Sequence, residues 1–204
     1  MENTKIKQKL GIKDIATVSA MMVICIIINM VVSSLLMAMP TMYLYFSAGL
    51  EGFLGASFYL VAANRINKKG LIFIWCTVYG LLQGVMGYIF MLPYFLVIGL
   101  IAELTMVGHN TYRNPVRNMI SWVVYWVGMF IGNCVPLWWA WESYREMAEM
   151  GGFPAATLDM QLKMTSSIPL MFLGACITIA ITALGVTFGN KLLHKHFNKA
   201  GIIK

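Results

Sequence analysis

Long apolar runs dominate the sequence and constrain its fold more than any other feature. Six stretches of about 17 to 23 residues contain almost no charged side chains, and a helix needs about 20 residues to cross a bilayer. They cover residues 15–37, 42–62, 71–89, 91–107, 119–139 and 168–189. Only 11% of the chain is charged, against about 25% in soluble domains. The sequence therefore predicts an all-α integral membrane protein, one transmembrane domain of six helices over residues 1–204, and excludes a soluble enzyme or a free nucleic-acid-binding domain.

The basic residues fall on one side of this six-helix arrangement. Under it, 13 of the 15 Lys and Arg residues lie on the face that holds both termini. They are Lys5, Lys7, Lys9 and Lys13 before the first run, Arg65, Lys68 and Lys69 after the second, Arg113 and Arg117 after the fourth, and Lys191, Lys195, Lys199 and Lys204 after the sixth. Positively charged loops stay in the cytoplasm, so both termini are expected there. The net charge of +7 indicates membrane topology and requires no nucleic acid.

Two regions are less regular than the rest. Only a few uncharged residues separate the third and fourth runs, so a re-entrant hairpin is an alternative to two spans there. The segment 140–167, expected outside the cell, is acidic and predicts a short amphipathic helix over 142–150 that two glycines end. The neighbouring Trp138 and Trp139 suit either anchoring at the membrane interface or a wall over an outward-facing pocket.

Two carboxylates, Glu51 and Glu103, lie within the apolar runs. Charged groups are costly at membrane depth, which makes each one a candidate functional residue. No Lys or Arg lies within a run, so the expected partners are the amides of Asn29, Gln83 and Asn133. Counted from the outer ends of their helices, these three amides and Glu51 lie about 9–14 Å deep.

A shared depth on four helices predicts a solute pocket that opens to the outside, with Trp138 and Trp139 among its walls. A hydrogen-bond network between the helices is the alternative for the same polar residues. Glu103 lies nearer the cytoplasmic face, and we expect it either to support packing or to take part in coupling and conformational change.

The sequence contains no catalytic or metal-binding pattern. Its three histidines lie outside the apolar runs, and there is no His-Glu-x-x-His, Gly-x-Ser-x-Gly or glycine-rich phosphate loop. We therefore expect a protein that is not an enzyme and that holds no metal or cofactor. The alternative is a small intramembrane enzyme in which Glu51 or Glu103 acts as acid or base.

A patch of small residues opens the first run, where Ala16 and Ala20 lie one helical turn apart with Ser19 beside them. Together with six spans, about 200 residues and cytoplasmic termini, this patch resembles the substrate-binding S component of an energy-coupling factor (ECF) transporter, of the type called Trep_Strep or MptD. In that family, an Ala-x-x-x-Ala near the start of the first helix docks onto the T subunit. The match falls on Ala16 and Ala20.

The resemblance implies a function. An S component lies in the bacterial cell membrane, captures a small nutrient such as a vitamin at the outer face, and delivers it through the T subunit and two ATPase subunits. Substrate binds near the outer face, and the subunit topples in the membrane once it has docked. A stand-alone secondary transporter or channel is the main alternative.

Overall fold

The computed structural model describes residues 10–108 and 110–197, and every regular element in those ranges is helical. The elements are α1 (Ile12–Met37), α2 (Pro40–Ile66), α3 (Leu71–Val85), α4 (Met91–Leu104), η1 (Thr111–Arg113), α5 (Pro115–Gly132), α6 (Val135–Trp139), α7 (Trp141–Met150), α8 (Ala155–Thr165), α9 (Ile168–Leu192) and η2 (Leu193–Phe197). The all-α class predicted from the sequence is confirmed for this part of the chain.

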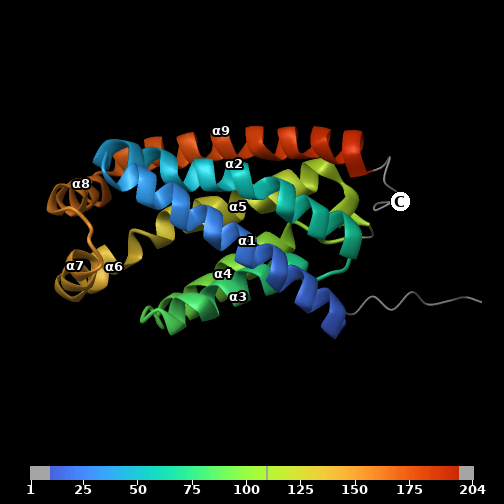
Figure 1. The fold of residues 1–204 in the computed structure, drawn as a ribbon, viewed down its shortest axis with the longest axis horizontal. Helices are drawn as coiled ribbons and strands as arrows, with labels where there is room; N and C mark the ends of the chain where they lie inside the picture. Colours follow the sequence, from blue (N-terminus) through green and yellow to red (C-terminus); the bar gives the residue numbers. More distant parts are fainter. Residues whose placement is uncertain (1–9, 109, 198–204) are drawn as a thin grey trace, which may run out of the picture.

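The long helices α1, α2, α5 and α9 run along the long axis of the molecule (Figure 1). The short helices α6, α7 and α8 gather at one end, which we call the cap end. The first turn of α1 and the last turn of α9 lie at the opposite end, the tail end (Figure 1). The hairpin of α3 and α4 stops short of the cap end, so α1 and α2 extend beyond it there (Figure 1).

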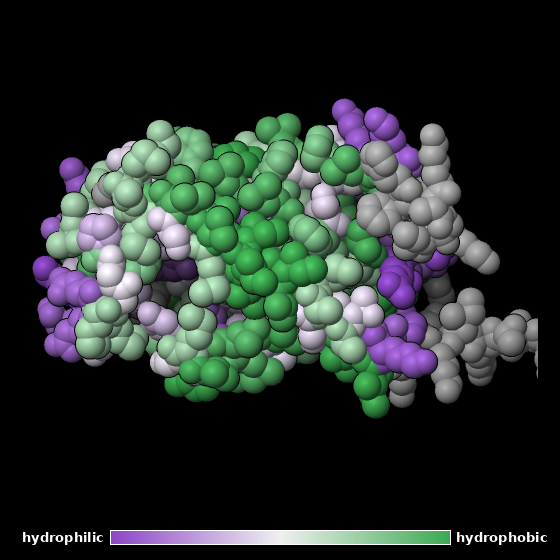
Figure 2. Space-filling view, viewed as in Figure 1, coloured by the Kyte–Doolittle hydropathy of each residue, from purple (hydrophilic) through white to green (hydrophobic). Residues whose placement is uncertain are grey.

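Three helical segments have the length and composition to cross a membrane, namely Ile12–Met37, Thr41–Ile66 and Ile168–Lys195. The helices α3 and α4 are apolar but have only 15 and 14 residues. They are therefore about 21–23 Å long, less than the hydrocarbon thickness of about 30 Å. Figure 2 shows an apolar band around the middle of the molecule with hydrophilic residues at both ends. This is the surface of a membrane protein.

Proline and glycine set the helix boundaries that differ from the predicted runs. The predicted run 119–139 is divided, because α5 ends at Gly132 and α6 begins at Val135. Pro136 has no N–H to continue the α5 hydrogen bonds, which explains the break. The run 71–89 ends early, at Val85, because the chain turns at Gly87 with φ of 100°. The acidic segment contains α7, as predicted. It also contains α8, which was not predicted from the sequence.

Glycines bring α2 and α9 into close contact. A Cβ atom on Gly185 of α9 would overlap the Phe53 backbone of α2, and one on Gly189 would lie 2.9 Å from Leu60. Glycine at these positions lets the two backbones approach more closely than any other residue would allow. The long helices α2 and α9 therefore form a rigid pair.

A layer of stacked aromatic side chains fills the bundle between its two ends. Tyr59 and Trp122 stack with ring centroids 4.5 Å apart, and Trp75 packs edge-on against both. All three are fully buried, and the Trp122 indole N–H donates to the Gly52 carbonyl at 2.9 Å. Tyr59 lies eight residues after Glu51 on α2, or about 12 Å along the helix. The aromatic layer therefore separates Glu51 from the tail end.

Candidate substrate-binding site

Glu51 lies in the cap-end half of α2 and is 6% exposed. Its Oε1 accepts a hydrogen bond of 2.7 Å from the hydroxyl of Ser33 on α1. The two ion pairs among the described residues are Lys68–Asp14 and Arg145–Glu149, so neither involves Glu51. A carboxylate has room for about four hydrogen bonds. Glu51 is thus a buried acceptor with most of its capacity unused within the described chain.

Two of the predicted amides meet at one tyrosine. The Gln83 side chain donates a hydrogen bond of 2.7 Å to the Tyr79 hydroxyl, and the Asn29 side chain also interacts with that hydroxyl. The carbonyl oxygen of the Asn29 side chain is buried and has no hydrogen-bond partner among the described residues. Tyr79 lies within electrostatic range of Glu51. The fold therefore brings Asn29 and Gln83 to one hydroxyl and places Glu51 within electrostatic range of it; we call Asn29, Glu51 and Gln83 the Glu51 cluster.

Tyrosines surround this cluster. Tyr43, near the start of α2, lies within electrostatic range of Glu51 and of three other tyrosines, Tyr79, Tyr88 and Tyr144. Tyr88 lies in the turn between α3 and α4, and Tyr144 lies on α7. Tyr43 and Tyr79 are therefore the tyrosines within electrostatic range of Glu51, and Tyr88 and Tyr144 lie near Tyr43.

The aromatic residues predicted for this wall, Trp138 and Trp139, are placed differently. Trp138 is 51% exposed on α6, and Trp139 is the last residue of that helix, with its side chain outside the described part of the chain. The aromatic residues found near Glu51 are tyrosines. These tyrosines were not among the residues predicted for this wall.

Asn133 lies beside the cluster rather than within it. It is the exposed residue that ends α5, and it lines a small cavity with Tyr43, Ser47 and Gln161. Gln161 of α8 is buried and donates to the Asn133 backbone carbonyl at 3.0 Å. It also accepts from the Tyr144 hydroxyl at 3.2 Å. Burial raises the pKa of Tyr144 to about 12, which keeps this hydroxyl protonated as the donor.

Gln161 therefore ties α7 and α8 to the end of α5, and it holds Tyr144, which lies near Tyr43. The surface is hollowed in the cap-end half of the molecule, and hydrophilic residues lie at the floor of the hollow (Figure 2). The short hairpin of α3 and α4 leaves that side of α1 and α2 uncovered near the cap end (Figure 1). A buried polar cluster, aromatic walls and a hollow surface are the elements of a small-molecule site.

The small-residue patch at the start of α1 is accessible. Ala16 and Ala20 are both exposed, and Ser19 is half-buried. The same stripe continues along α1 with large apolar side chains, because Val23 is 52% and Ile27 56% exposed. The stripe therefore has small side chains near the tail end, at Ala16 and Ala20, and large side chains further along α1, at Val23 and Ile27.

Comparison with known protein families settles the class of the chain. Residues 12–199 match the family described as hypothetical bacterial integral membrane protein (Trep_Strep). The chain belongs to the Trep_Strep family. No curated protein and no solved structure matches it. A Trep_Strep chain is thus a bacterial integral membrane protein, in agreement with the three candidate spans.

The second carboxylate within the apolar runs of the Trep_Strep chain, Glu103, caps a helix. One oxygen of Glu103 accepts from the backbone N–H of Gly70 at 2.7 Å, and the other accepts from the Tyr112 hydroxyl. Burial raises the pKa of Tyr112, which remains the neutral donor, and its oxygen accepts from the Ile72 N–H. Gly70 and Ile72 form the N-terminus of α3, where backbone N–H groups lack helical partners and favour a negative charge.

This geometry favours packing support over coupling, the two roles that the sequence left open for Glu103. The sequence predicted amides as the partners of the two carboxylates. The donors in the structure are instead the hydroxyls of Ser33 and Tyr112. Ser33 lies one turn beyond Asn29 on the same helix, and this spacing is the one signal in the Trep_Strep sequence that pointed to it.

No group of three or more His, Cys, Asp or Glu side chains that could hold a metal ion lies within residues 10–108 and 110–197. The Glu51 cluster therefore offers hydrogen-bond acceptors and aromatic faces.

Proposed function

We propose that this protein is the substrate-binding S subunit of an ECF-type importer in the bacterial cell membrane. Six helices, α1, α2, α3, α4, α5 and α9, form the membrane bundle, in which the shorter α3 and α4 span a locally thinner layer, and both termini lie in the cytoplasm. The cap end then faces outside, where the subunit captures a small nutrient. A T subunit and two ATPase subunits supply the energy.

The observation that carries this proposal is the Glu51 cluster beneath the cap end. Its carboxylate has one hydrogen-bond donor, from Ser33, and its Asn29 carbonyl has none among the described residues. Buried acceptors that lack donors destabilise a protein unless a ligand or water satisfies them. A solute that donates several N–H groups, or that carries a positive charge, would satisfy both acceptors and lie against the tyrosine rings.

Two further features support the same function. The aromatic layer of Tyr59, Trp75 and Trp122 lies between the cluster and the tail end, which suits capture from one side better than an open pore. The exposed Ala16 and Ala20 present a flat surface near the tail end, where a helix of the T subunit would approach closely.

Reconstitution tests the proposal against its alternatives. The small molecule that co-purifies with the chain is identified by mass spectrometry, and its radiolabelled form is offered to proteoliposomes. We expect ATP-dependent uptake when the T and ATPase subunits are present, and binding without uptake when the chain is alone. Uptake by the chain alone would identify a secondary transporter or channel, and chemical conversion without ATP would identify an enzyme. Either result would overturn the proposal.

A further inference from the structure

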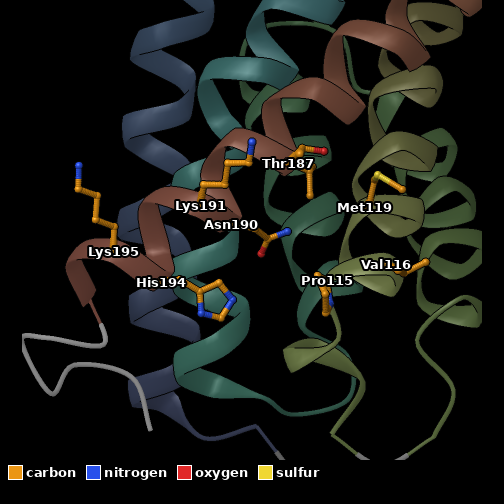
Figure 3. Close-up of a pocket in the computed structure, with 9 residues that line it drawn as sticks. Pro115, Val116, Met119, Thr187, Asn190, Lys191, His194 and Lys195 are labelled. Carbon is orange, nitrogen blue, oxygen red and sulfur yellow. The ribbon is translucent and has the colours of Figure 1, made fainter.

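A second cavity lies at the tail end, between the start of α5 and the end of α9. It measures about 750 Å³. Its lining residues are Pro115, Val116, Met119, Val186, Thr187, Asn190, Lys191, His194 and Lys195 (Figure 3). We call it the tail groove. It lies at the tail end, whereas the Glu51 cluster lies in the cap-end half, and none of the groove's residues belongs to α1, α2 or α3.

The tail groove is amphipathic along its length. Val116, Met119 and Val186 form apolar walls, and Val116 is 56% exposed. The cations Lys191 and Lys195 lie one turn apart near the end of α9, and both are exposed. Figure 3 shows Lys195 beside the end of α9 on the side away from α5, whereas Met119 and Thr187 lie further into the bundle. The lysines therefore lie on the α9 side of the groove, and the apolar residues Val116 and Met119 lie on the α5 side (Figure 3).

No ion pair involves Lys191 or Lys195 within the described residues. The carboxylates of the tail end are engaged elsewhere, since Asp14 pairs with Lys68 at 2.6 Å and Glu103 binds Gly70 and Tyr112. An anion that faces these two lysines must come from outside the described chain.

The position along the membrane span identifies that anion. The segment Ile168–Lys195 is apolar enough to cross a membrane, so Lys191 and Lys195 lie where acyl chains give way to headgroups. Lysines at such positions attract anionic lipids, and their aliphatic stems extend over apolar surface. A free phosphate ion would leave the apolar walls exposed, whereas a phospholipid covers the walls with an acyl chain and meets the lysines with its phosphate.

We propose that the tail groove binds an anionic phospholipid. One acyl chain lies against Val116, Met119 and Val186, and the headgroup lies between Lys191 and Lys195. Because α5 and α9 both line the groove, the bound lipid joins the tail ends of the two helices. This site is independent of the substrate and of the ECF assignment.

The test compares two lipids that differ only in headgroup charge. The full chain is purified, stripped of lipid in neutral detergent, and titrated with dioleoyl phosphatidylglycerol or dioleoyl phosphatidylcholine by native mass spectrometry. Each lysine near an anionic headgroup is worth about a fivefold preference, so we expect the anionic lipid to bind about 30-fold more tightly. Lys191→Ala/Lys195→Ala should remove that preference, and Lys191→Arg/Lys195→Arg should keep it.

The matched control is Arg65→Ala/Lys69→Ala, which removes the same charge from exposed residues of the tail end outside the groove. It should keep the preference. Val116→Trp, which fills the groove at an exposed position, should weaken binding of both lipids. Circular dichroism checks the helix content of each variant. Equal binding of the two lipids by the wild type would overturn the proposal, and so would unchanged binding in the alanine pair or in Val116→Trp. Loss of a co-purifying protein from the alanine pair, with lipid binding unchanged, would assign the groove to a protein partner instead.

Discussion

The two intramembrane carboxylates differ in how the chain satisfies them. Glu103 accepts from Gly70 and Tyr112, and its charge faces the N-terminus of α3. Among the described residues, the donor to Glu51 is Ser33, and Tyr43 and Tyr79 lie within electrostatic range of it. A carboxylate that receives several hydrogen bonds from the fold has a structural role. One that receives few can accept further hydrogen bonds from a ligand.

This difference predicts opposite results for the same substitution. Glu51→Gln should lower retention of the co-purifying small molecule about tenfold, because it replaces a carboxyl oxygen that can accept from the ligand with an NH2 donor, and leaving a buried donor unpaired costs about 1–3 kcal/mol. Glu103→Gln should leave retention intact and lower the melting temperature in detergent, because it weakens the cap of α3. Mass spectrometry of the bound ligand and a thermal melt measure the two effects. Equal loss of ligand in both variants would contradict the assignment of Glu51.

Among the long helices, α1 has the fewest buried residues, namely Val18, Met22 and Cys25. Its exposed stripe is small at Ala16 and Ala20 and bulky at Val31, which is 54% exposed. A partner helix can approach closely only where side chains are small.

The docking prediction follows from this stripe. Ala16→Trp or Ala20→Trp should abolish co-purification with a T subunit while the bundle keeps its helix content. Val31→Trp, one turn beyond Ile27 on the same stripe and nearer the cap end, is the control and should co-purify normally. Pull-down from a co-expressing strain measures the complex. Normal complex formation by both alanine variants would exclude this patch as the docking surface.

The pair of α2 and α9 carries a second prediction at this scale. Gly185→Ala places a Cβ atom against the Phe53 backbone, which has no flexible side chain to move aside. Such overpacking costs about 1–3 kcal/mol, so the melting temperature in detergent should fall by several degrees. Gly11→Ala is the control, because its nearest neighbour would be 3.7 Å away. A melting temperature equal to that of the wild type would mean that α2 and α9 are less closely packed than described.

For the whole molecule, orientation in the membrane remains the central prediction. Single cysteines are introduced into a variant whose own four cysteines have been replaced, and right-side-out membrane vesicles are prepared. Lys163→Cys on α8 should then react with a membrane-impermeant maleimide. Lys69→Cys, between α2 and α3, should react only after the membrane is permeabilised. Both lysines are exposed, so accessibility within the fold is matched. The reverse pattern would invert the topology, and labelling of both from outside would contradict the six-span arrangement.

Membrane character and helical class followed from the sequence, because an apolar run that enters lipid must satisfy its own backbone hydrogen bonds and so becomes a helix. The runs also located α1, α2 and α9 to within a few residues. The helix α8 was missed because Asp159, Gln161 and Lys163 make Ala155–Thr165 look like a polar loop. Its role depends on Gln161, which contacts α7 and the end of α5.

Counting residues from helix ends brought Asn29, Glu51 and Gln83 to a common depth, and the fold brings these three together. The same count placed Asn133 in the pocket, whereas the structure places it beside a neighbouring small cavity. It also gave no sign of Ser33 or Tyr112, because depth along a helix carries no information about which face meets which neighbour. The sequence by itself determined that this chain is a helical membrane protein with two carboxylates inside it. Only the tertiary structure decided that Glu103 caps α3 while Glu51 lies short of donors, because tilt and rotation of packed helices choose the partners of a buried charge.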